Sequence, residues 1–338
     1  MDGDPPGAAA RMRDVARVAQ VSAMTVSRAL KDPERVSPEV RARIERAVRQ
    51  VGYVPNRLAG SLSSSRSNVI GLVVPSISNS LFASTIQGIS DVLRRHGHEL
   101  MIASSGYGEA AEEAAIRAFL GQRVAGLILH DTTHSPEAVA MIRRAGIPVV
   151  ENGTLTRQPL DMVVSYSNHD ASMAMTRHLL RLGYRRIGFV TLPLAANERS
   201  RDRRRGYAAA LDEAGLPYDP RLVLEVPPGL AAGVEALDRL LEGGGDPDAI
   251  FFAGDVLAIG AALECNRRGW PVPGRVAIAA FDNIDLLGHL VPPVTTLRLP
   301  RHEIGRRSAE VLLDRIEGRA TGPLTVDLRF EIIHRAST

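Results

Sequence analysis

The most specific chemical signal in the sequence is a run of small polar residues and one arginine at residues 22–30. The run reads SAMTVSRAL, and in a helix Val26, Ala29 and Leu30 would share one apolar face. The outer face then carries Arg28, whose guanidinium can donate two hydrogen bonds to the edge of a guanine. Small side chains beside it can touch a thymine methyl or bond phosphate oxygens. We predict base contacts for Ala23, Met24 and Arg28, and phosphate contacts for Ser22, Thr25 and Ser27.

Three short helices are expected to position these side chains. Apolar residues at helical spacing predict a first helix over residues 15–19, and Ser22 caps a second helix that runs to Leu30. The cap sequence SPE at residues 37–39 predicts a third helix, which Gly52 ends. This is the pattern of a helix-turn-helix with a bracing helix. A purely structural three-helix unit with an exposed arginine has the same pattern, so the residues alone leave that alternative open.

Positive charge is concentrated in the same region. Residues 11–57 hold eleven Lys and Arg against five Asp and Glu, a net charge of +6, whereas the whole chain of 338 residues carries +3 and the remainder therefore −3. A small basic domain attached to a mildly acidic larger one is typical of polyanion binding. The first ten residues lack the basic start and apolar run of a secretory signal, no apolar run is long enough for a membrane helix, and Cys265 is the only cysteine. We therefore expect a cytoplasmic protein without membrane contact.

From Asn68 onward, apolar strand patterns alternate with amphipathic helical stretches. Strands are predicted at VIGLVV, ELMIAS, VAGLIL, PVVEN, MVVSY, RIGFVT, LVLEV, AIFFAG and VAIAAF. Most of these runs are apolar throughout, as in parallel sheets covered by helices on both faces. The pattern recurs before and after about Tyr166, which predicts an α/β core of two Rossmann-like lobes with a ligand cleft at the carboxyl ends of the strands.

The motifs DVA, VS-x-x-TVSR and GY-x-PN-x-x-A-x-x-L between residues 14 and 62 closely resemble the headpiece of the lactose/galactose-repressor family. The resemblance implies the same base and phosphate contacts, adds a phosphate contact of Asn56, and places Ala59 and Leu62 in a hinge helix that enters the minor groove. Gly60 gives this hinge poor helix propensity, so we expect DNA to order it, although a simple flexible linker is the alternative. The expected domains are a disordered N-terminus at residues 1–10, the headpiece at 11–57, the hinge at 58–67 and an effector-binding core at 68–338.

The core resembles the same family over essentially its whole length, in motifs such as GD-x-x-A-x-G from Gly254 and PP-x-TT from Pro292. The resemblance implies the fold of the periplasmic sugar-binding proteins, with a first lobe at about 68–166 and 295–322 and a second at about 167–294 and 323–338. Residues 127–152 and 262–281 are most similar to the gluconate-utilisation repressors. The effector-binding positions implied are Phe82, His130, Glu151, Tyr166, Arg203, Asp282 and Arg301.

These cleft residues have side chains suited to a polyhydroxy acid. Asp282 can accept hydrogen bonds from hydroxyl groups, and Arg203 presents a planar fork that can hold a carboxylate or phosphate. Solvent exposure is the alternative for Arg203, because it lies in the arginine-rich run RSRDRRRGY. His130 could instead be a strand-end histidine bonded within its own lobe, and Phe82 and Tyr166 form either an apolar wall of the cleft or part of the core.

The expected partners are a palindromic double-stranded operator, a second copy of the chain and a small effector, gluconate or a related sugar acid. Gly254 stands where the family commonly has an asparagine that binds sugar hydroxyls, so one ligand contact is expected to be missing or replaced. An enzyme is the first alternative, but the nucleotide, zinc-protease and nucleophile-elbow motifs are absent. A sugar-binding protein without a DNA role is the second, and the helix-turn-helix argues against it. His96 and His98 flank Gly97 in the turn between a helix and a strand, and the pair His130/His134 lacks a third ligand, so we expect neither a metal nor a cofactor.

Overall fold

The computed structural model describes residues 10–54 and 67–338, apart from residues 78, 80, 107 and 196. The chain divides into two compact units, residues 1–67 and residues 68–338. The expected disordered segment, except for Ala10, and the expected hinge, except for Ser67, lie outside the described residues. Within the described ranges, no helix is both long enough and apolar enough to cross a membrane.

The first unit contains the predicted helix-turn-helix. Its helices are α1 (Met12–Ala19), α2 (Ala23–Lys31) and α3 (Pro38–Val51), with a 3-10 turn at Pro33–Arg35. The Ser22 hydroxyl accepts a hydrogen bond from Thr25 N at 3.1 Å and caps α2, and the Ser37 hydroxyl caps α3 by accepting from Val40 N at 3.4 Å. Gly52 ends α3 in the left-handed conformation, with a φ of 65°. The buried side chains that join the helices include Val15, Ala19, Val26, Ile44 and Ala47.

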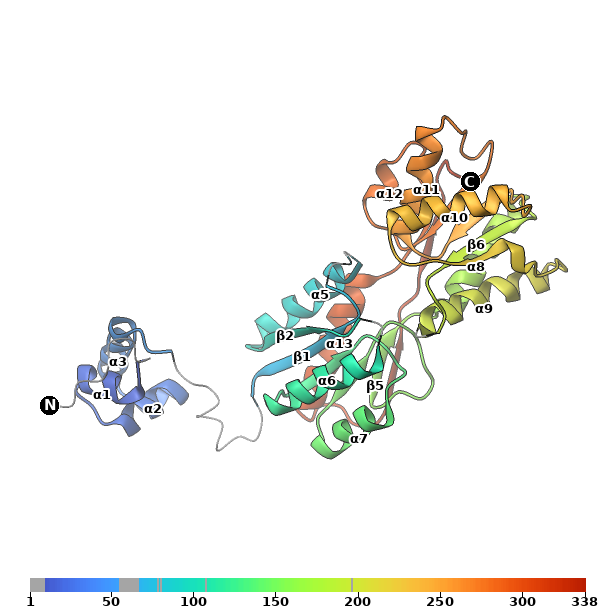
Figure 1. The fold of residues 1–338 in the computed structure, drawn as a ribbon. Coiled ribbons are helices and arrows are strands. Elements are labelled where there is room, and N and C mark those ends of the chain that lie inside the picture. The colour runs from blue at the N-terminus through green and yellow to red at the C-terminus, as the bar shows by residue number, and fades with distance from the viewer. Residues whose placement is uncertain (1–9, 55–66, 78, 80, 107, 196) are drawn as a thin grey trace. The chain divides into compact units, whose positions relative to one another are not determined.

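The first lobe of the second unit is a parallel sheet in the order β11-β5-β4-β3-β1-β2. Its strands are β1 (Val69–Val74), β2 (Glu99–Ser104), β3 (Gly126–Leu129), β4 (Val149–Glu151), β5 (Met162–Ser165) and β11 (Leu324–Asp327). Helices α5 (Leu81–Arg95) and α13 (Arg301–Ile316) cover one face, and α6 (Glu109–Gly121) and α7 (Pro136–Ala145) cover the other (Figure 1). Successive residues of β1 point to opposite faces, so that Leu72 packs with α5 and α13, and Val73 with α6 and α7.

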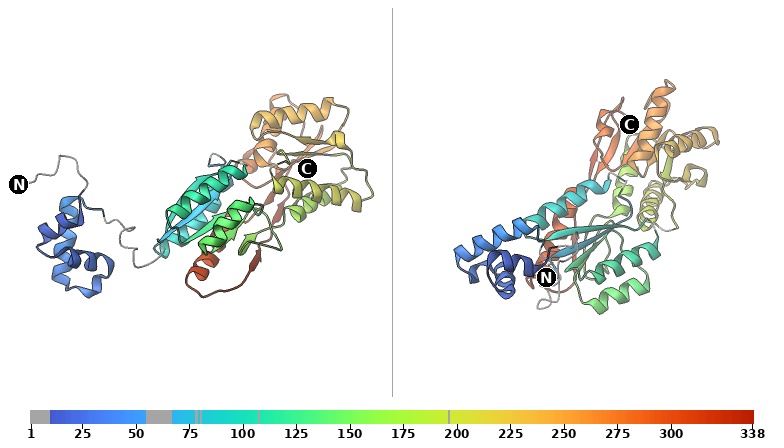
Figure 2. Two further views of the ribbon diagram at one scale, coloured as in Figure 1. Left: turned by 60° about the horizontal axis from the view of Figure 1, so that its bottom comes forward. Right: turned by 60° about the vertical axis from the view of Figure 1, so that its left-hand side comes forward.

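The second lobe repeats this plan with the sheet order β12-β10-β9-β8-β6-β7. Its strands are β6 (Ile187–Thr191), β7 (Val223–Glu225), β8 (Ala249–Phe252), β9 (Ala277–Phe281), β10 (Thr295–Arg298) and β12 (Glu331–Ile333), which pairs antiparallel with β10. Helices α8 (Asn168–Arg181) and α9 (Glu198–Glu213) cover one face, and α10 (Leu230–Glu242) and α11 (Asp255–Arg267) the other (Figure 2). A 3-10 turn at Pro220–Leu222 and the short helix α12 (Leu286–His289) complete the lobe.

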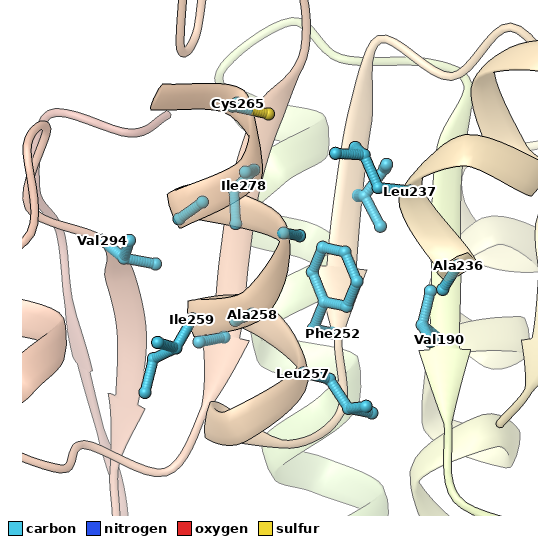
Figure 3. Close-up of a cluster of buried hydrophobic side chains, with 14 of the residues drawn as sticks. Val190, Ala236, Leu237, Phe252, Leu257, Ala258, Ile259, Cys265, Ile278 and Val294 are labelled. Carbon is cyan, nitrogen blue, oxygen red and sulfur yellow. The ribbon is translucent and has the colours of Figure 1, made fainter. Parts of the chain in front are cut away.

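Helix α11 is held firmly against the second sheet. Figure 3 shows Ala258 and Cys265 of α11 beside Phe252 of β8 and Ile278 of β9. Gly260 lets α10 approach closely, since a Cβ there would lie 2.1 Å from the carbonyl oxygen of Leu230. Burial raises the pKa of the Cys265 thiol to about 11, so the thiol is an apolar core group. This packing fixes the N-terminus of α11, and with it Asp255, at the carboxyl edge of the sheet.

The nine predicted strands are all present, but two regions lie in the other lobe than predicted. Residues 295–298, expected in the first lobe, form β10 and pair with β9 of the second. Residues 324–327, expected in the second lobe, form β11 and pair with β5 of the first. The chain therefore passes between the lobes after β5, after β10 and again after β11. Side chains stabilise β10 in the second lobe, because the Thr295 hydroxyl donates to the carbonyl oxygen of Arg335 at 3.1 Å.

Candidate functional site

The exposed face of α2 carries the predicted base-contacting residues. Ala23, Met24 and Arg28 are all exposed, Met24 by 71%, whereas Val26 and Ala29 are buried. The small side chain of Ala23 and the long side chains of Met24 and Arg28 thus lie together on the exposed face of α2, as in helices that enter the major groove.

The predicted phosphate-contacting residues flank this face. Ser22 is exposed, Thr25 and Ser27 are half-buried, and the hydroxyls of Ser22 and Thr25 lie 2.9 Å apart. Asn56, Ala59 and Leu62 lie outside the described residues, so their DNA contacts stay predictions.

Arg203 of α9 lies buried between the two lobes. Its Nε donates to Asn168 Oδ1 at 2.8 Å, its Nη1 donates to the carbonyl oxygen of Ala253 at 2.8 Å, and its Nη2 lies 3.5 Å from the Tyr166 hydroxyl. The guanidinium also stacks on the Phe281 ring, 3.7 Å from the centroid. Burial lowers the pKa of Arg203, but a guanidinium stays charged at neutral pH. Arg203 is therefore a buried cation whose hydrogen-bond partners among the described residues are neutral.

Two aspartates lie beside Arg203 at the carboxyl ends of β9 and β8. Asp282 follows β9 with a φ of 72°, and Arg301, the first residue of α13, donates to its Oδ1 from Nε at 2.9 Å and also from Nη2. Asp255 begins α11, and its Oδ1 accepts from Val256 N at 2.7 Å. The Oδ2 atoms of both aspartates are buried and have no hydrogen-bond partner within the described structure. Burial, followed by the charge of Asp282, raises the pKa of Asp255 to about 7.

The first lobe contributes His130 and Asn152 to the same region. His130 Nδ1 lies 2.7 Å from Asn152 Oδ1, and because an amide oxygen only accepts, Nδ1 carries the proton. Burial lowers the pKa of His130 well below its usual value, so the imidazole is neutral. Phe82, at the start of α5, packs edge-on against this ring with centroids 4.6 Å apart. Asn152 Nδ2 is buried and has no partner in the described part of the chain, which leaves an unused donor.

Glu151 does not offer a free oxygen to the cleft, contrary to the expectation that it binds the effector. Its Oε1 lies 3.2 Å from His134 Nε2, and its Oε2 accepts from Leu160 N at 2.6 Å. His134 Nδ1 lies 2.9 Å from Glu112 Oε2. Burial alone would lower the pKa of His134, but its hydrogen bonds to the two carboxylates raise it to about 10. Glu151 and Glu112 therefore hold a buried imidazolium, which fixes the loop after β3.

Polar contacts join the lobes around the cleft. The Glu198 carboxylate, at the start of α9, accepts from Thr132 N at 2.8 Å and from the hydroxyls of Thr132 and Thr133 at 3.0 and 2.6 Å. Ion pairs connect Arg199 with Asp131 and Arg301 with Asp282, each pair having one member in either lobe. Asn168 Nδ2 donates to the carbonyl oxygen of Gly153 at 2.8 Å, and the Thr154 hydroxyl lies 3.2 Å from Asp202 Oδ2.

With these contacts made, the space at Arg203 is small. A cavity of about 50 Å³ is lined by residues that include Phe82, His130, Arg203 and Arg301. A second pocket, of about 430 Å³, is lined by residues that include Asp282 and Arg301. A sugar acid is larger than the inner cavity, so the lobes must separate at their polar contacts to admit it and can close around it only with a wider space at Arg203.

The structure thus brings Phe82, His130, Tyr166, Arg203, Asp282 and Arg301 together at the cleft. Sequence reasoning did not single out Asp255, Asn152, Asn168, Arg199 or Glu198. Asp255 directly follows the predicted strand AIFFAG and Asn152 ends the predicted strand PVVEN, so their strand-end positions were the available signal. No group of three or more His, Cys, Asp or Glu among the described residues could hold a metal ion.

Comparison with known proteins connects both units to one family. Residues 11–56 match the bacterial regulatory proteins of the lacI family, and residues 176–338 match the periplasmic binding protein-like domain. The chain is 36% identical over 322 residues to the HTH-type transcriptional regulator GntR of Escherichia coli K12, covering 95% of this chain and 96% of the relative. It is 33% identical over 334 residues to the HTH-type transcriptional repressor CytR of the same strain, covering 98% and 96%. The crystal structure of a LacI family transcriptional regulator from Silicibacter pomeroyi is similar with a TM-score of 0.90 and 33% identity, covering 97% of this chain and 99% of that one.

Proposed function

The chain belongs to the LacI family of DNA-binding transcriptional regulators, and we propose that it represses genes of sugar-acid catabolism under the control of gluconate or a closely related effector. Regulators of this family bind operator DNA and small-molecule effectors and form dimers. The similarity of residues 127–152 and 262–281 to gluconate-utilisation repressors supports the effector class. As a regulator of transcription, the protein would act in the cytoplasm.

The observation that carries this proposal is the mixed charge of the buried cleft. Arg203 is a cation whose hydrogen-bond partners among the described residues are neutral, and its Nη2 lies 3.5 Å from the Tyr166 hydroxyl. Within the same part of the chain, one carboxylate oxygen of Asp282 and the amide donor of Asn152 have no partner. A polyhydroxy acid matches this set, because its carboxylate can bind Arg203 while its hydroxyls satisfy the other groups. A neutral sugar would leave Arg203 without an anion as hydrogen-bond acceptor.

The remaining cleft residues would shape and neutralise the site. In this proposal Phe82 and Tyr166 form apolar walls, His130 offers its unprotonated Nε2 to a hydroxyl, and Arg301 holds Asp282 in place. Glu151 acts through His134 and does not contact the effector.

The exposed face of α2 would read the operator. We assign base contacts to Ala23, Met24 and Arg28, phosphate contacts to Ser22, Thr25, Ser27 and Asn56, and minor-groove contacts of the hinge to Ala59 and Leu62. One headpiece offers few base contacts, so a homodimer on a palindromic site with half-sites one helical turn apart is proposed.

Calorimetric titration with gluconate tests the effector assignment. Arg203→Ala and Asp282→Ala should each abolish measurable binding while leaving operator affinity intact, because headpiece and cleft lie in separate compact units. Arg205→Ala is the matched control, since Arg205 lies on the same helix with its side chain 70% exposed, and it should bind gluconate as the wild type does. Unchanged gluconate affinity in both cleft variants would remove the proposed site.

A further inference from the structure

Asp255 is a buried carboxyl group beside the cleft, and contact with the helix N-terminus occupies one of its two oxygens. Its side chain begins α11, the residue is 1% exposed, and Oδ1 accepts from Val256 N at 2.7 Å. One oxygen is enough for that contact with the helix N-terminus. The second oxygen, Oδ2, is equally buried and has no partner within the described ranges. A carboxylate in this position would leave a charged acceptor unsatisfied.

The charged groups around Asp255 do not supply the missing partner. Asp282 faces it from the end of β9, Arg203 from α9 and Arg301 from the start of α13. Arg203 donates to neutral acceptors, and Arg301 donates to Asp282. Burial and the neighbouring carboxylate of Asp282 favour the uncharged form of Asp255, whereas the hydrogen bond from Val256 N and the charges of Arg301 and Arg203 oppose it less strongly. Burial and Asp282 accordingly raise the pKa of Asp255 to about 7.

Gly254 leaves room for a ligand next to this carboxyl group. A Cβ at position 254 would meet nothing closer than Leu257 Cδ1 at 3.8 Å, and the backbone is extended with a φ of −173°. Neither sterics nor conformation requires glycine here. Position 254 therefore leaves open space immediately next to Asp255 in the chain.

We propose that Asp255 contacts the effector as a protonated carboxyl group, so that an anionic effector binds together with one proton. The inference rests on the proposed sugar-acid effector and deepens it. The ligand carboxylate adds a negative charge beside Asp255 and Asp282, which disfavours ionised Asp255 further. The protonated Oδ2 then donates a hydrogen bond to a ligand oxygen. The proton comes from solvent on binding and returns to it on release.

Titration of the full-length protein with gluconate at pH 6 and pH 8 tests this linkage. With a free carboxyl group that titrates near pH 7, affinity should be about tenfold weaker at pH 8 than at pH 6. Calorimetry at pH 8 in buffers of different ionisation enthalpy should show uptake of nearly one proton. Neutral glucitol should show no uptake. His130 is neutral and His134 charged across this range, so neither accounts for the change.

Two substitutions separate a hydrogen-bond donor from a structural role. Asp255→Asn places an amide where the protonated carboxyl stands, so it should bind gluconate at both pH values about as tightly as the wild type does at pH 6. Asp255→Ala lacks the donor and should bind at least tenfold more weakly with no pH dependence. Asp285→Asn is the control, because the Asp285 side chain is 99% exposed, and it should keep the wild-type pH dependence.

The outcomes separate the two proposals. Equal wild-type affinity at pH 6 and pH 8, or an unchanged pH dependence in Asp255→Asn, would overturn the role of Asp255 and leave gluconate as effector. No binding of gluconate by the wild type at either pH would overturn the sugar-acid effector and this inference with it.

Discussion

The contact of Glu198 with the loop after β3 should set how easily the two lobes separate. Glu198 lies in the second lobe, and its carboxylate accepts hydrogen bonds from Thr132 N and from the hydroxyls of Thr132 and Thr133 in the first lobe. Both lobes contribute residues to the proposed effector site, so the ligand binds the closed arrangement. Glu198→Ala should therefore weaken gluconate binding although Glu198 is assigned no ligand contact.

The size of this effect follows from the contacts. Hydrogen bonds to a charged acceptor contribute roughly 1.5–3 kcal/mol each, but Glu198 is partly exposed, and water replaces its partners when the lobes open. We expect the net loss to be on the order of 2 kcal/mol, which corresponds to a roughly 30-fold weaker apparent affinity when closure limits binding. The gluconate concentration needed for half of the operator response should move by the same factor.

Calorimetry and operator release together check this reasoning. Glu213→Ala is the matched control, because Glu213 lies on the same helix and pairs with Arg177 of the second lobe, with both side chains about half exposed. Loss of this exposed ion pair, which lies within one lobe, should change the affinity for gluconate less than threefold. Equal affinities of Glu198→Ala and the wild type would refute a lobe contact that limits binding. Operator affinity without gluconate, measured in parallel, excludes misfolding as the cause of any loss.

Three further substitutions test the buried histidine and the recognition helix. His134→Gln should lower the free energy of unfolding by roughly 3–5 kcal/mol at pH 7, because two buried carboxylates lose their cation. The pKa of His134 in the folded protein is about 10, above the ordinary 6.5, so this stabilisation is complete below pH 6.5 and declines toward pH 10. The denaturant unfolding curves of the variant and the wild type should therefore converge near pH 10. Equal stability of the two proteins at pH 7 would contradict the assignment. Arg28→Ala should cost roughly 1–3 kcal/mol of operator binding and relax one base position, whereas Ser27→Ala should weaken all sequences alike. Indistinguishable results in binding-site selection would show that α2 faces DNA differently.

Local patterns predicted most of the fold because most of the elements that they describe are buried or capped by specific residues, although β2 and β7 are partly exposed. The nine apolar runs became strands, and Ser22, Ser37 and Gly52 cap their helices. The missed strands β10, β11 and β12 read TTLR, LTVD and EII, which are short and only partly apolar. Their lobe assignment depends on pairing with distant strands, and no local periodicity encodes that choice.

The candidate site was predictable to the extent that it lies at strand ends. Asp282 and Tyr166 directly follow strands. Arg203 is buried, so the alternative that it is solvent-exposed like other residues of its arginine-rich run is wrong. Glu151 was misassigned because its partner His134 is supplied by a loop, and a loop's path cannot be derived from spacing. Glu198 was missed for the same reason, since its partners lie 65 and 66 residues away in the other lobe.

The arrangement at Asp282 indicates the direction in which the effector acts on the lobes. Arg301 of the first lobe uses Oδ1 of Asp282, and Oδ2 is the atom left for a ligand hydroxyl. Ligand binding and the interlobe ion pair therefore use different oxygens of one carboxylate and do not compete. A ligand shifts an equilibrium between arrangements only by its difference in affinity for them. Since lobes that close around the ligand can keep the ion pair and gain ligand contacts from both sides, we expect the effector to favour closure. The first lobe begins with β1 at Val69, directly after the predicted hinge at residues 58–67, so we expect the first lobe to transmit this closure to the operator.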